Sequence, residues 1–347
     1  MGYSIVSLKE FGGPEVLAVE TIGEIPEPGD SEVRVKVLAC SAAFTDTLIR
    51  RGIYPEVRQI PPITPGYDMI GVVDKLGDGV THLAVGEKVA ELTITGSYSE
   101  YMILEADRLI PVPDGLDDVE AIALILSYVT AHQMLTRVAK VQAGDSVLIH
   151  GAGGVVGQAL VQLGAVLGLK MYGTASLSQH EALRERGCEP IDYKNEDFVR
   201  TIRSKEPNGL TAVFDALGRN HFRRSLKVLA RTGTLVAYGS YMATSSAELA
   251  KDFLMVNVWN LLPWRPSAAF YSIGAWHRQH HNWFKDDLST LFLWLAQGKI
   301  KPSISKTMKL EEAAQAHALL ENGQAGGKIV LLVGNPDLPG TGATTIE

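Results

Sequence analysis

A cluster of four glycines stands near the middle of the chain, with three of them spaced as GxxGxxG. The apolar run Val147–Ile149 leads into the cluster, and an apolar pattern of helical spacing follows from Gln158 to Leu167. A strand, a glycine turn and a helix in this order form a phosphate-binding site. The glycines let backbone N–H groups approach a diphosphate, and the helix N-terminus adds partial positive charge. The predicted cofactor contacts in this loop are Gly151, Gly153, Gly154, Val155, Val156 and Gly157.

The end of the next expected strand predicts which dinucleotide binds. An NAD site carries Asp or Glu there, about 20 residues beyond the glycines, to hold the ribose hydroxyl groups. This chain reads Tyr172-Gly173-Thr174-Ala175-Ser176-Leu177-Ser178, with no acid. The small hydroxyl side chains of Thr174 and Ser176 leave room for a 2′-phosphate. The sequence therefore predicts NADPH as the cofactor.

The elements that position these residues alternate along the middle of the chain. Strands are expected at 146–150, 170–173, 212–215 and 234–238, separated by helices, which predicts a doubly wound parallel sheet over residues 126–268. Residues 1–125 show frequent turn signals and the strictly alternating strand Val33–Val37, as in a β-barrel. Helices at 287–297 and 311–320 and a strand at 328–333 belong to a third range, 269–347, whose tail from Asn335 is expected to fray.

Composition limits the class of protein. The 347 residues are 46% apolar and 20% charged, with a net charge of −7, which fits a soluble globular protein and argues against a nucleic-acid partner. The only cysteines, Cys40 and Cys188, exclude a disulfide framework and indicate a reducing compartment, the cytoplasm. No signal peptide is visible. The uncharged stretch between Asp145 and Lys170 contains six glycines, so a buried strand and helix explain it better than a membrane span.

Several motifs in one order resemble the zinc-free quinone oxidoreductase group of the medium-chain dehydrogenase/reductase superfamily. Within that group, the chain is most similar to the subgroup that includes homologues of a synaptic vesicle membrane protein. The resemblance implies a GroES-like β-barrel catalytic domain, a Rossmann domain, a C-terminal return to the first domain, and a homodimer. The motifs that carry it are Phe11–Leu17, Arg51–Pro55, Pro65–Asp68, Val85–Val89, Tyr128–Ala131, Gly173–Ser176 and Gly327–Leu331.

The same resemblance implies further cofactor contacts. Thr130 matches the residue beside the nicotinamide amide, and Tyr193 matches a phosphate contact. Relatives carry Lys or Arg near the position held here by His180, and Arg184 follows one turn later, either as a phosphate ligand or on an exposed helix face. The remaining expected contacts are Gly239, Ser240, Phe270 and Lys328.

Residues that could bind a metal are missing where zinc relatives carry them. The matching Cys and His positions fall on Ala43 and Tyr67, and no cysteine-rich lobe exists, so four nitrogen or sulfur ligands cannot assemble. We therefore expect no metal. The histidines of the segment Trp276–Asn282 are interpreted as a solvated polar stretch rather than as ligands.

Without a Lewis acid, hydride must go to an acceptor that is already electrophilic, such as a quinone or an α,β-unsaturated carbonyl. The carbonyl oxygen then needs a hydrogen-bond donor and a proton. Tyr54, Tyr67 and Tyr128 match positions that line the family's cleft, and Tyr54 and Tyr128 are the first choices for that donor. Each could instead be a packed aromatic. Asp46 is expected to be structural.

Other interpretations stay open. Quinone reductases usually place Asn where this chain has Ala43, which favours a bulkier or more apolar substrate. An enoyl-thioester reductase, or an NADP(H)-binding adaptor without turnover, would share these motifs. Five tryptophans fall between residues 259 and 294, where they could form a substrate wall, a subunit interface or ordinary core packing.

Overall fold

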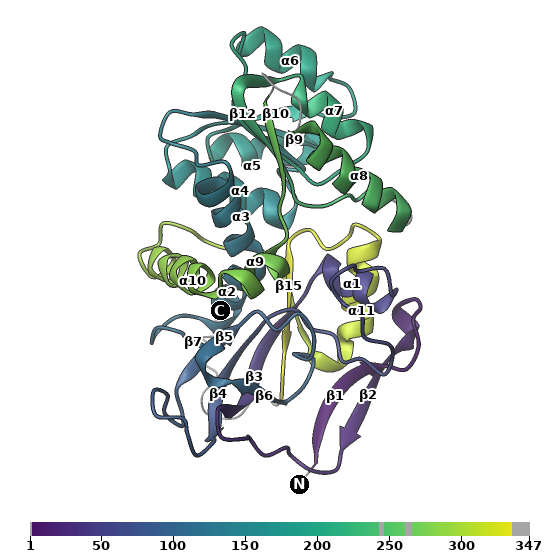
Figure 1. Cartoon of the computed structure of the whole chain (residues 1–347), viewed down its shortest axis with the longest axis vertical. Coiled ribbons are helices and arrows are strands. Elements are labelled where there is room, and N and C mark those ends of the chain that lie inside the picture. The colour runs from purple at the N-terminus through teal and green to yellow at the C-terminus, as the bar shows by residue number, and fades with distance from the viewer. Residues whose placement is uncertain (1, 243–245, 261–265, 335–347) are drawn as a thin grey trace. The chain divides into compact units, whose positions relative to one another are not determined.

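The computed structural model describes residues 2–242, 246–260 and 266–334. The chain forms two compact units, one made of Met1–Leu126 with His277–Glu347 and the other of Ser127–Trp276 (Figure 1). The tail expected to fray, and Trp264, lie outside the described residues. The other four tryptophans are divided between the units, with Trp259 and Trp276 in the second and Trp283 and Trp294 in the first.

The first unit is built on a mixed sheet with strand order β14-β15-β3-β4-β5-β7, in which β6 also pairs with β3. The long strand β3 (Glu32–Ala42) contains the alternating segment predicted from the sequence, and its valines at 33, 35 and 37 are buried. The other strands are β1 (Tyr3–Leu8), β2 (Leu17–Ile22), β4 (Met69–Leu76), β5 (Lys88–Glu91), β6 (Tyr101–Glu105), β7 (Ile110–Pro111), β14 (Ile304–Lys309) and β15 (Lys328–Leu332). The helices are α1 (Phe44–Arg50), α2 (Asp118–Ala123), α10 (His281–Ala296) and α11 (Ala313–Glu321), and α9 (Ile273–Gln279) crosses the boundary between the units.

The end of the chain completes this sheet. Strand β15 pairs antiparallel with β3, which brings Leu331 opposite Cys40, and β14 pairs parallel with β15. In Figure 1 the yellow C-terminal strand β15 lies among the purple and blue N-terminal strands. Segments about 290 residues apart in sequence therefore share one core.

The second unit is a six-stranded parallel sheet with helices on both sides (Figure 1). Its strand order, β10-β9-β8-β11-β12-β13, reverses direction between β8 and β11, which is where doubly wound folds bind dinucleotides. The strands are β8 (Ser146–His150), β9 (Lys170–Ala175), β10 (Cys188–Asp192), β11 (Leu210–Asp215), β12 (Leu229–Ala237) and β13 (Ser267–Phe270). The helices are α3 (Val129–Gln133), α4 (Val155–Val166), α5 (His180–Glu185), α6 (Phe198–Lys205), α7 (Asn220–Leu226) and α8 (Ser246–Trp259).

The expected parallel sheet is confirmed, and the two edge strands are additional to the four predicted. Strand β10 contains Pro190, which cannot donate to a ladder and which edge strands tolerate. Strand β13 spans four residues and contains neither a β-branched residue nor an alternating pattern. Helix α4 begins at Val155, three residues before the predicted start, because Gly154 is its extended N-cap residue.

One helical stretch, Asp118–Val138, is long and apolar enough to span a membrane by length and composition alone. It joins α2 to α3 through π-helical turns at Leu124–Tyr128 and Met134–Val138. Of its most apolar window, 83% is buried, as in the core helix of a globular protein.

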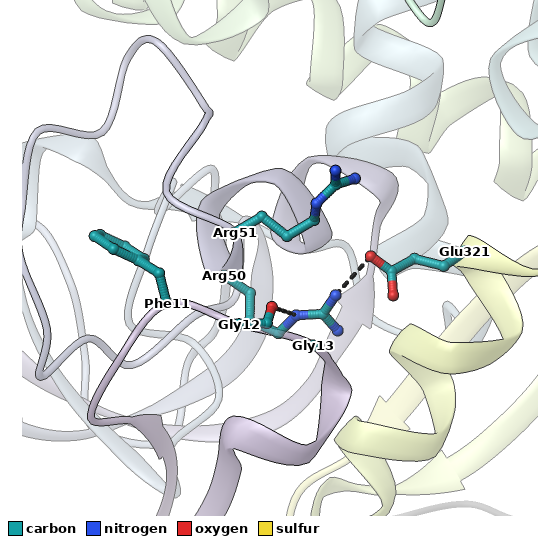
Figure 2. Close-up of a pocket in the computed structure, with 6 residues that line it drawn as sticks. All are labelled: Phe11, Gly12, Gly13, Arg50, Arg51 and Glu321. Carbon is teal, nitrogen blue, oxygen red and sulfur yellow. Dashed lines mark hydrogen bonds and ion pairs between the residues drawn. The ribbon is translucent and has the colours of Figure 1, made fainter. Parts of the chain in front are cut away.

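The buried side chain of Arg50 joins distant segments of the first unit (Figure 2). Its Nε donates to the carbonyl oxygen of Gly12 at 3.1 Å, and its Nη2 lies 2.6 Å from Oε1 of Glu321. The two ring nitrogens of His317 lie 3.5 Å from Nη1 of Arg50 and 3.0 Å from the hydroxyl of Tyr98. Because a buried charge that loses its partner is strongly destabilising, this cluster fixes α11 against α1.

His317 makes the stability of this unit depend on pH. Burial, together with the Arg50 charge, lowers the pKa of His317 from 6.5 to about 3. The unfolded chain gains a proton below about pH 6.5 while folded His317 stays neutral, so stability is lost as the pH falls from 6.5 toward 3. We expect His317→Gln to reduce the loss of unfolding free energy between pH 7 and pH 5 by about 2 kcal/mol, measured by urea unfolding.

The matched control is His82→Gln, because the side chain of His82 is half exposed in the same unit. This control should lose as much stability as the parent over the same pH interval. An unchanged loss in His317→Gln would show that His317 carries no part of the acid sensitivity.

Candidate active site

The glycine loop between β8 and α4 has the backbone geometry of a diphosphate cradle. Gly151 adopts the left-handed conformation, with φ of +66°, directly after the end of β8. A Cβ atom at Gly157 would lie 2.2 Å from the carbonyl oxygen of Gly151, so only glycine lets the first turn of α4 pack this closely on the loop. The N–H groups of Val155, Val156 and Gly157 occupy the first helical positions, which have no intrahelical partner. The residues present therefore fit a diphosphate.

Thr174 acts on this loop from β9. Its hydroxyl oxygen accepts from the N–H of Gly151 at 3.1 Å, and its carbonyl oxygen accepts from the N–H of Ala152 at 3.0 Å. The predicted contact Thr174 thus holds the start of the loop, and both of its oxygens are used within the protein.

The carboxyl end of β9 is free of acidic side chains, as the sequence shows. Ser176 and Ser178 place their hydroxyl oxygens 3.1 Å apart, and Gln179 lies against Gly153, whose carbonyl oxygen its amide reaches at 3.3 Å. His180 is buried, with Nε2 3.4 Å from the carbonyl oxygen of Ala175. Its ring therefore points back into the protein rather than onto an exposed helix face.

A cation that the sequence patterns did not reveal, Lys194, follows the neighbouring strand β10. The register of β9 and β10 pairs Ala175 with Asp192, so the exposed residues Tyr193 and Lys194 follow β10 just as Ser176 follows β9. The ammonium group of Lys194 lies 5.9 Å from the centre of the Tyr193 ring. The sequence signal for Lys194 was its position next to Tyr193, a predicted phosphate contact. Only the pairing of β9 with β10 shows that Lys194 follows a strand next to Ser176.

The remaining predicted contacts of the second unit follow the ends of other strands or lie on α3. Gly239 and Ser240 come after β12, and Ser240 donates to the carboxylate of Asp252. Phe270 ends β13 and packs edge-on against Phe253, with ring centres 5.6 Å apart. Thr130, another predicted contact, is buried in α3, and the predicted catalytic residue Tyr128 is buried directly before that helix.

In the first unit, the structure brings together two of the predicted catalytic residues. The hydroxyl oxygens of Tyr54 and Tyr67 are 2.7 Å apart, and their rings meet edge to face at 5.8 Å. Tyr67 is fully buried and Tyr54 only partly, so Tyr54 is the accessible member of the pair. Burial raises the pKa of both hydroxyl groups, which keeps them neutral at pH 7.

Asp46 supports this pair from α1. Its two carboxylate oxygens accept from the N–H groups of Ala43 at 2.8 Å and Gly66 at 3.2 Å. The residue therefore ties the start of α1 to the segment that carries Tyr67. Burial raises the pKa of Asp46 to about 7.

Lys328 is predicted to contact the cofactor, and the structure buries it in the first unit. Its ammonium lies 3.5 Å from Asp68, whose other oxygen accepts from the backbone N–H of Ser41 at 3.0 Å. The side chain of Lys328 is 3% exposed, so its charge is committed to this buried pair.

Among the described residues, one cluster offers three ligand atoms within 4.8 Å of one another: His150, Asp215 and His221, all in the second unit. Hydrogen bonds already join these side chains to one another or to Ser225. The expectation that the chain holds no metal stays a prediction.

The interpretation of the histidine-rich stretch as solvated is wrong for His277. This side chain is 1% exposed, and its Nε2 lies 3.3 Å from Glu91. Arg108 contacts both of them, with an Nη2 atom 2.8 Å from Glu91 and 3.0 Å from Nδ1 of His277. Contacts with Glu91 and Arg108, which are far from His277 in sequence, enclose this residue, and the local sequence carries no signal for them.

A pocket of about 300 Å³ also opens on the first unit, around the buried ion pair of Arg50 (Figure 2). None of the predicted site residues lines it. Its walls are Phe11, Gly12, Gly13, Arg50, Arg51 and Glu321.

Comparison with known proteins identifies the family. The alcohol dehydrogenase GroES-like domain matches residues 29–114, and the family described as zinc-binding dehydrogenase matches residues 187–331. A 2-haloacrylate reductase of Burkholderia sp is 34% identical over 92% of this chain and 96% of that protein. The human synaptic vesicle membrane protein VAT-1 homolog is 30% identical over 94% of this chain and 86% of its own length.

Solved structures agree. The quinone oxidoreductase of Escherichia coli, complexed with NADPH, superimposes with a TM-score of 0.83 at 26% identity, covering 95% of this chain and 99% of that one. The expected GroES-like and Rossmann-type architecture is confirmed. The chain is therefore an oxidoreductase of the medium-chain dehydrogenase/reductase superfamily and belongs to its zinc-free quinone oxidoreductase group.

Proposed function

We propose that this protein is a zinc-independent, NADPH-dependent reductase of α,β-unsaturated carbonyl compounds or quinones. The observation that carries the proposal is the hydroxyl pair Tyr54–Tyr67, in which Tyr67 stands where zinc relatives have a metal-ligating histidine. A pair of neutral hydroxyl groups can donate hydrogen bonds but cannot act as a Lewis acid. The acceptor must therefore be electrophilic without metal activation.

The two hydroxyl groups have unequal roles in this proposal. Either hydroxyl group of this pair can donate, and the proposal takes Tyr67 as the donor, so that the Tyr54 proton is directed toward the substrate. When bound, NADPH would supply hydride to the β-carbon of a conjugated carbonyl. As charge builds on the substrate oxygen, Tyr54 donates a hydrogen bond there and then its proton, and water returns a proton to Tyr54.

The walls of the substrate site differ from those usual in quinone reductases. Ala43 stands where Asn is usual, and its small side chain is 9% exposed. Loss of a polar group removes one partner for a quinone oxygen and leaves more apolar space. An acyclic or bulky enone is therefore the substrate class we favour.

Discrimination for NADPH is proposed to come from Ser176 and Lys194. No acid stands at the end of β9 to hold a ribose hydroxyl, and buried His180 faces a carbonyl oxygen. Lys194, beside Tyr193 at the end of the paired strand, brings the positive charge that a 2′-phosphate needs. The NADPH complex of the Escherichia coli relative supports this cofactor.

We further propose a cytoplasmic homodimer. Both cysteines are buried and free, which suits a reducing compartment. Size-exclusion chromatography with light scattering tests the dimer.

The proposed reaction is tested by following NADPH oxidation with four acceptors: a naphthoquinone, an alkenal, a cyclic enone and a trans-2-enoyl-coenzyme A. We expect turnover with the enone or the alkenal to exceed that with the quinone, because Ala43 supplies no polar group. Turnover of the thioester alone would favour an enoyl-thioester reductase. Nucleotide binding without turnover of any acceptor would favour an adaptor.

Cofactor choice is tested by steady-state kinetics. We expect KM for NADPH to be at least about tenfold below KM for NADH. Lys194→Gln should raise KM for NADPH about tenfold and leave KM for NADH within about twofold, because only NADPH carries the 2′-phosphate. Lys227→Gln, at the exposed end of α7, is the control and should change neither. Equal KM values for both cofactors in the parent would contradict the NADPH assignment.

The role of Tyr54 is tested by removing its hydroxyl group. Tyr54→Phe should lower kcat at least about tenfold with the Kd for NADPH unchanged, because the donor to the substrate oxygen is lost. Tyr67→Phe should lower kcat less, since Tyr54 keeps its own proton. A Tyr54→Phe rate within about twofold of the parent would remove this residue from the proposed reaction.

A further inference from the structure

A continuous chain of hydrogen bonds runs beneath the glycine loop, through residues that the proposed reaction does not use. His150, the last residue of β8, places Nδ1 3.1 Å from the hydroxyl of Thr174 and Nε2 3.1 Å from the hydroxyl of Ser225. Ser225 on α7 in turn donates to Asp215 Oδ2 at 2.7 Å, and His221 Nδ1 lies 2.7 Å from the same oxygen. His150, Thr174, Asp215 and Ser225 are all buried.

The donors in this chain of hydrogen bonds all point in one direction, toward Asp215. Although burial opposes its charge, the histidines and hydrogen bonds around it hold the pKa of Asp215 below its usual range, so the carboxylate only accepts. Ser225 gives it a proton and must itself accept from Nε2–H of His150. Burial lowers the pKa of His150 to about 3, so the ring is neutral and its Nδ1 accepts from Thr174.

This direction determines how Thr174 meets the loop. Since the hydroxyl proton of Thr174 points to His150, its lone pairs face the N–H of Gly151. Gly151 has the left-handed backbone that turns the chain from β8 into the loop. The orientation of the later N–H groups, which would meet a diphosphate, follows from this anchored first residue.

The chain of hydrogen bonds also crosses the point where the strand order of the sheet reverses. Thr174 and His150 belong to β9 and β8, on one side, and Asp215 ends β11 on the other. The remaining oxygen of Asp215 accepts from the N–H of Leu217 at 2.8 Å, which holds the loop after β11. Loops on both sides of the dinucleotide crevice are thus joined by buried side chains.

We propose that Asp215, Ser225 and His150 are positioning residues that orient the Thr174 hydroxyl toward Gly151 and so hold the glycine loop in its dinucleotide-binding conformation. The inference rests on the proposed use of a dinucleotide. It assigns these residues no contact with the reacting atoms and no part in choosing between NADPH and NADH.

A metal ion bound by His150, Asp215 and His221 is the competing explanation for this cluster. The hydrogen-bond chain already uses both nitrogens of His150, and Asp215 Oδ2 accepts from two donors. A buried divalent ion would have to displace these bonds, which is why we favour the chain. If the purified protein contained stoichiometric zinc and the His221→Ala variant lost it, the hydrogen-bond explanation would be overturned.

The first test compares two substitutions at Thr174. Thr174→Val keeps the branched shape but removes the hydroxyl, and Thr174→Ser keeps the hydroxyl. Fluorescence titration should show that Thr174→Val raises the Kd for NADPH and for NADH by the same factor, about fivefold to tenfold. Thr174→Ser should stay within about twofold of the parent for both. Thermal unfolding without nucleotide gives the folded fraction used in each titration.

The second test asks whether the hydrogen bonds between Thr174 and Asp215 act together on the glycine loop. Ser225→Ala removes the third hydrogen bond from Gly151, between His150 and Ser225, and should raise both Kd values at least about threefold. The double variant Thr174→Val/Ser225→Ala should bind both nucleotides no more weakly than Thr174→Val alone, because the effects of substitutions within one network are not additive. Nitrogen-15 NMR should find the proton of His150 on Nε2 in the parent and partly on Nδ1 in Ser225→Ala.

The outcomes separate this inference from the proposed function. If the parent protein binds neither nucleotide, the proposed function fails. If the parent binds them and Thr174→Val binds equally well, the positioning role is wrong. A proton on Nδ1 of His150 in the parent, or effects that multiply in the double variant, would also overturn it.

Discussion

A diphosphate can be held by backbone N–H groups only where no side chain stands between the backbone and the ligand. In this protein that constraint falls on the turn from β8 into α4, where a Cβ atom at Gly157 would lie 2.2 Å from the carbonyl oxygen of Gly151. The close approach aligns the first turn of α4 with the crevice at the edge of the sheet. The rest of the second unit keeps that turn in place.

The turn is kept in place from below by polar side chains. Thr174 accepts from Gly151, and the chain through His150 and Ser225 ends on the buried carboxylate of Asp215. Buried polar groups are costly when they lack partners, but a fully satisfied network specifies one arrangement of the strands that carry it. The carboxylate of Asp215 sets the direction of the hydrogen bonds and so couples the two halves of the parallel sheet.

The first unit uses its buried polar groups differently, because the hydroxyl of Tyr67 stands where zinc relatives place a metal-ligating histidine. Tyr54 and Tyr67 share a hydrogen bond, and burial keeps both protonated. Asp46 uses both oxygens on backbone N–H groups and holds the helix start near them. Such a site can donate hydrogen bonds but cannot polarise an unactivated alcohol or ketone as zinc does. Reduction of conjugated acceptors is therefore the chemistry that this unit favours.

Local patterns in the sequence determined the glycine loop, the parallel sheet and the missing metal ligands, because each depends on residue types at short spacing. The strand β8 and the helix start could be placed to within three residues for this reason. Tertiary structure alone decided that His180 faces inward, that Lys194 stands beside the end of β9, and that Lys328 pairs with Asp68. It also decided that His150, Thr174, Asp215 and Ser225 form one chain of hydrogen bonds. These facts depend on which strands become neighbours and which faces pack. Lys328 and Asp68, for example, are 260 positions apart in sequence and meet only when the sheet forms.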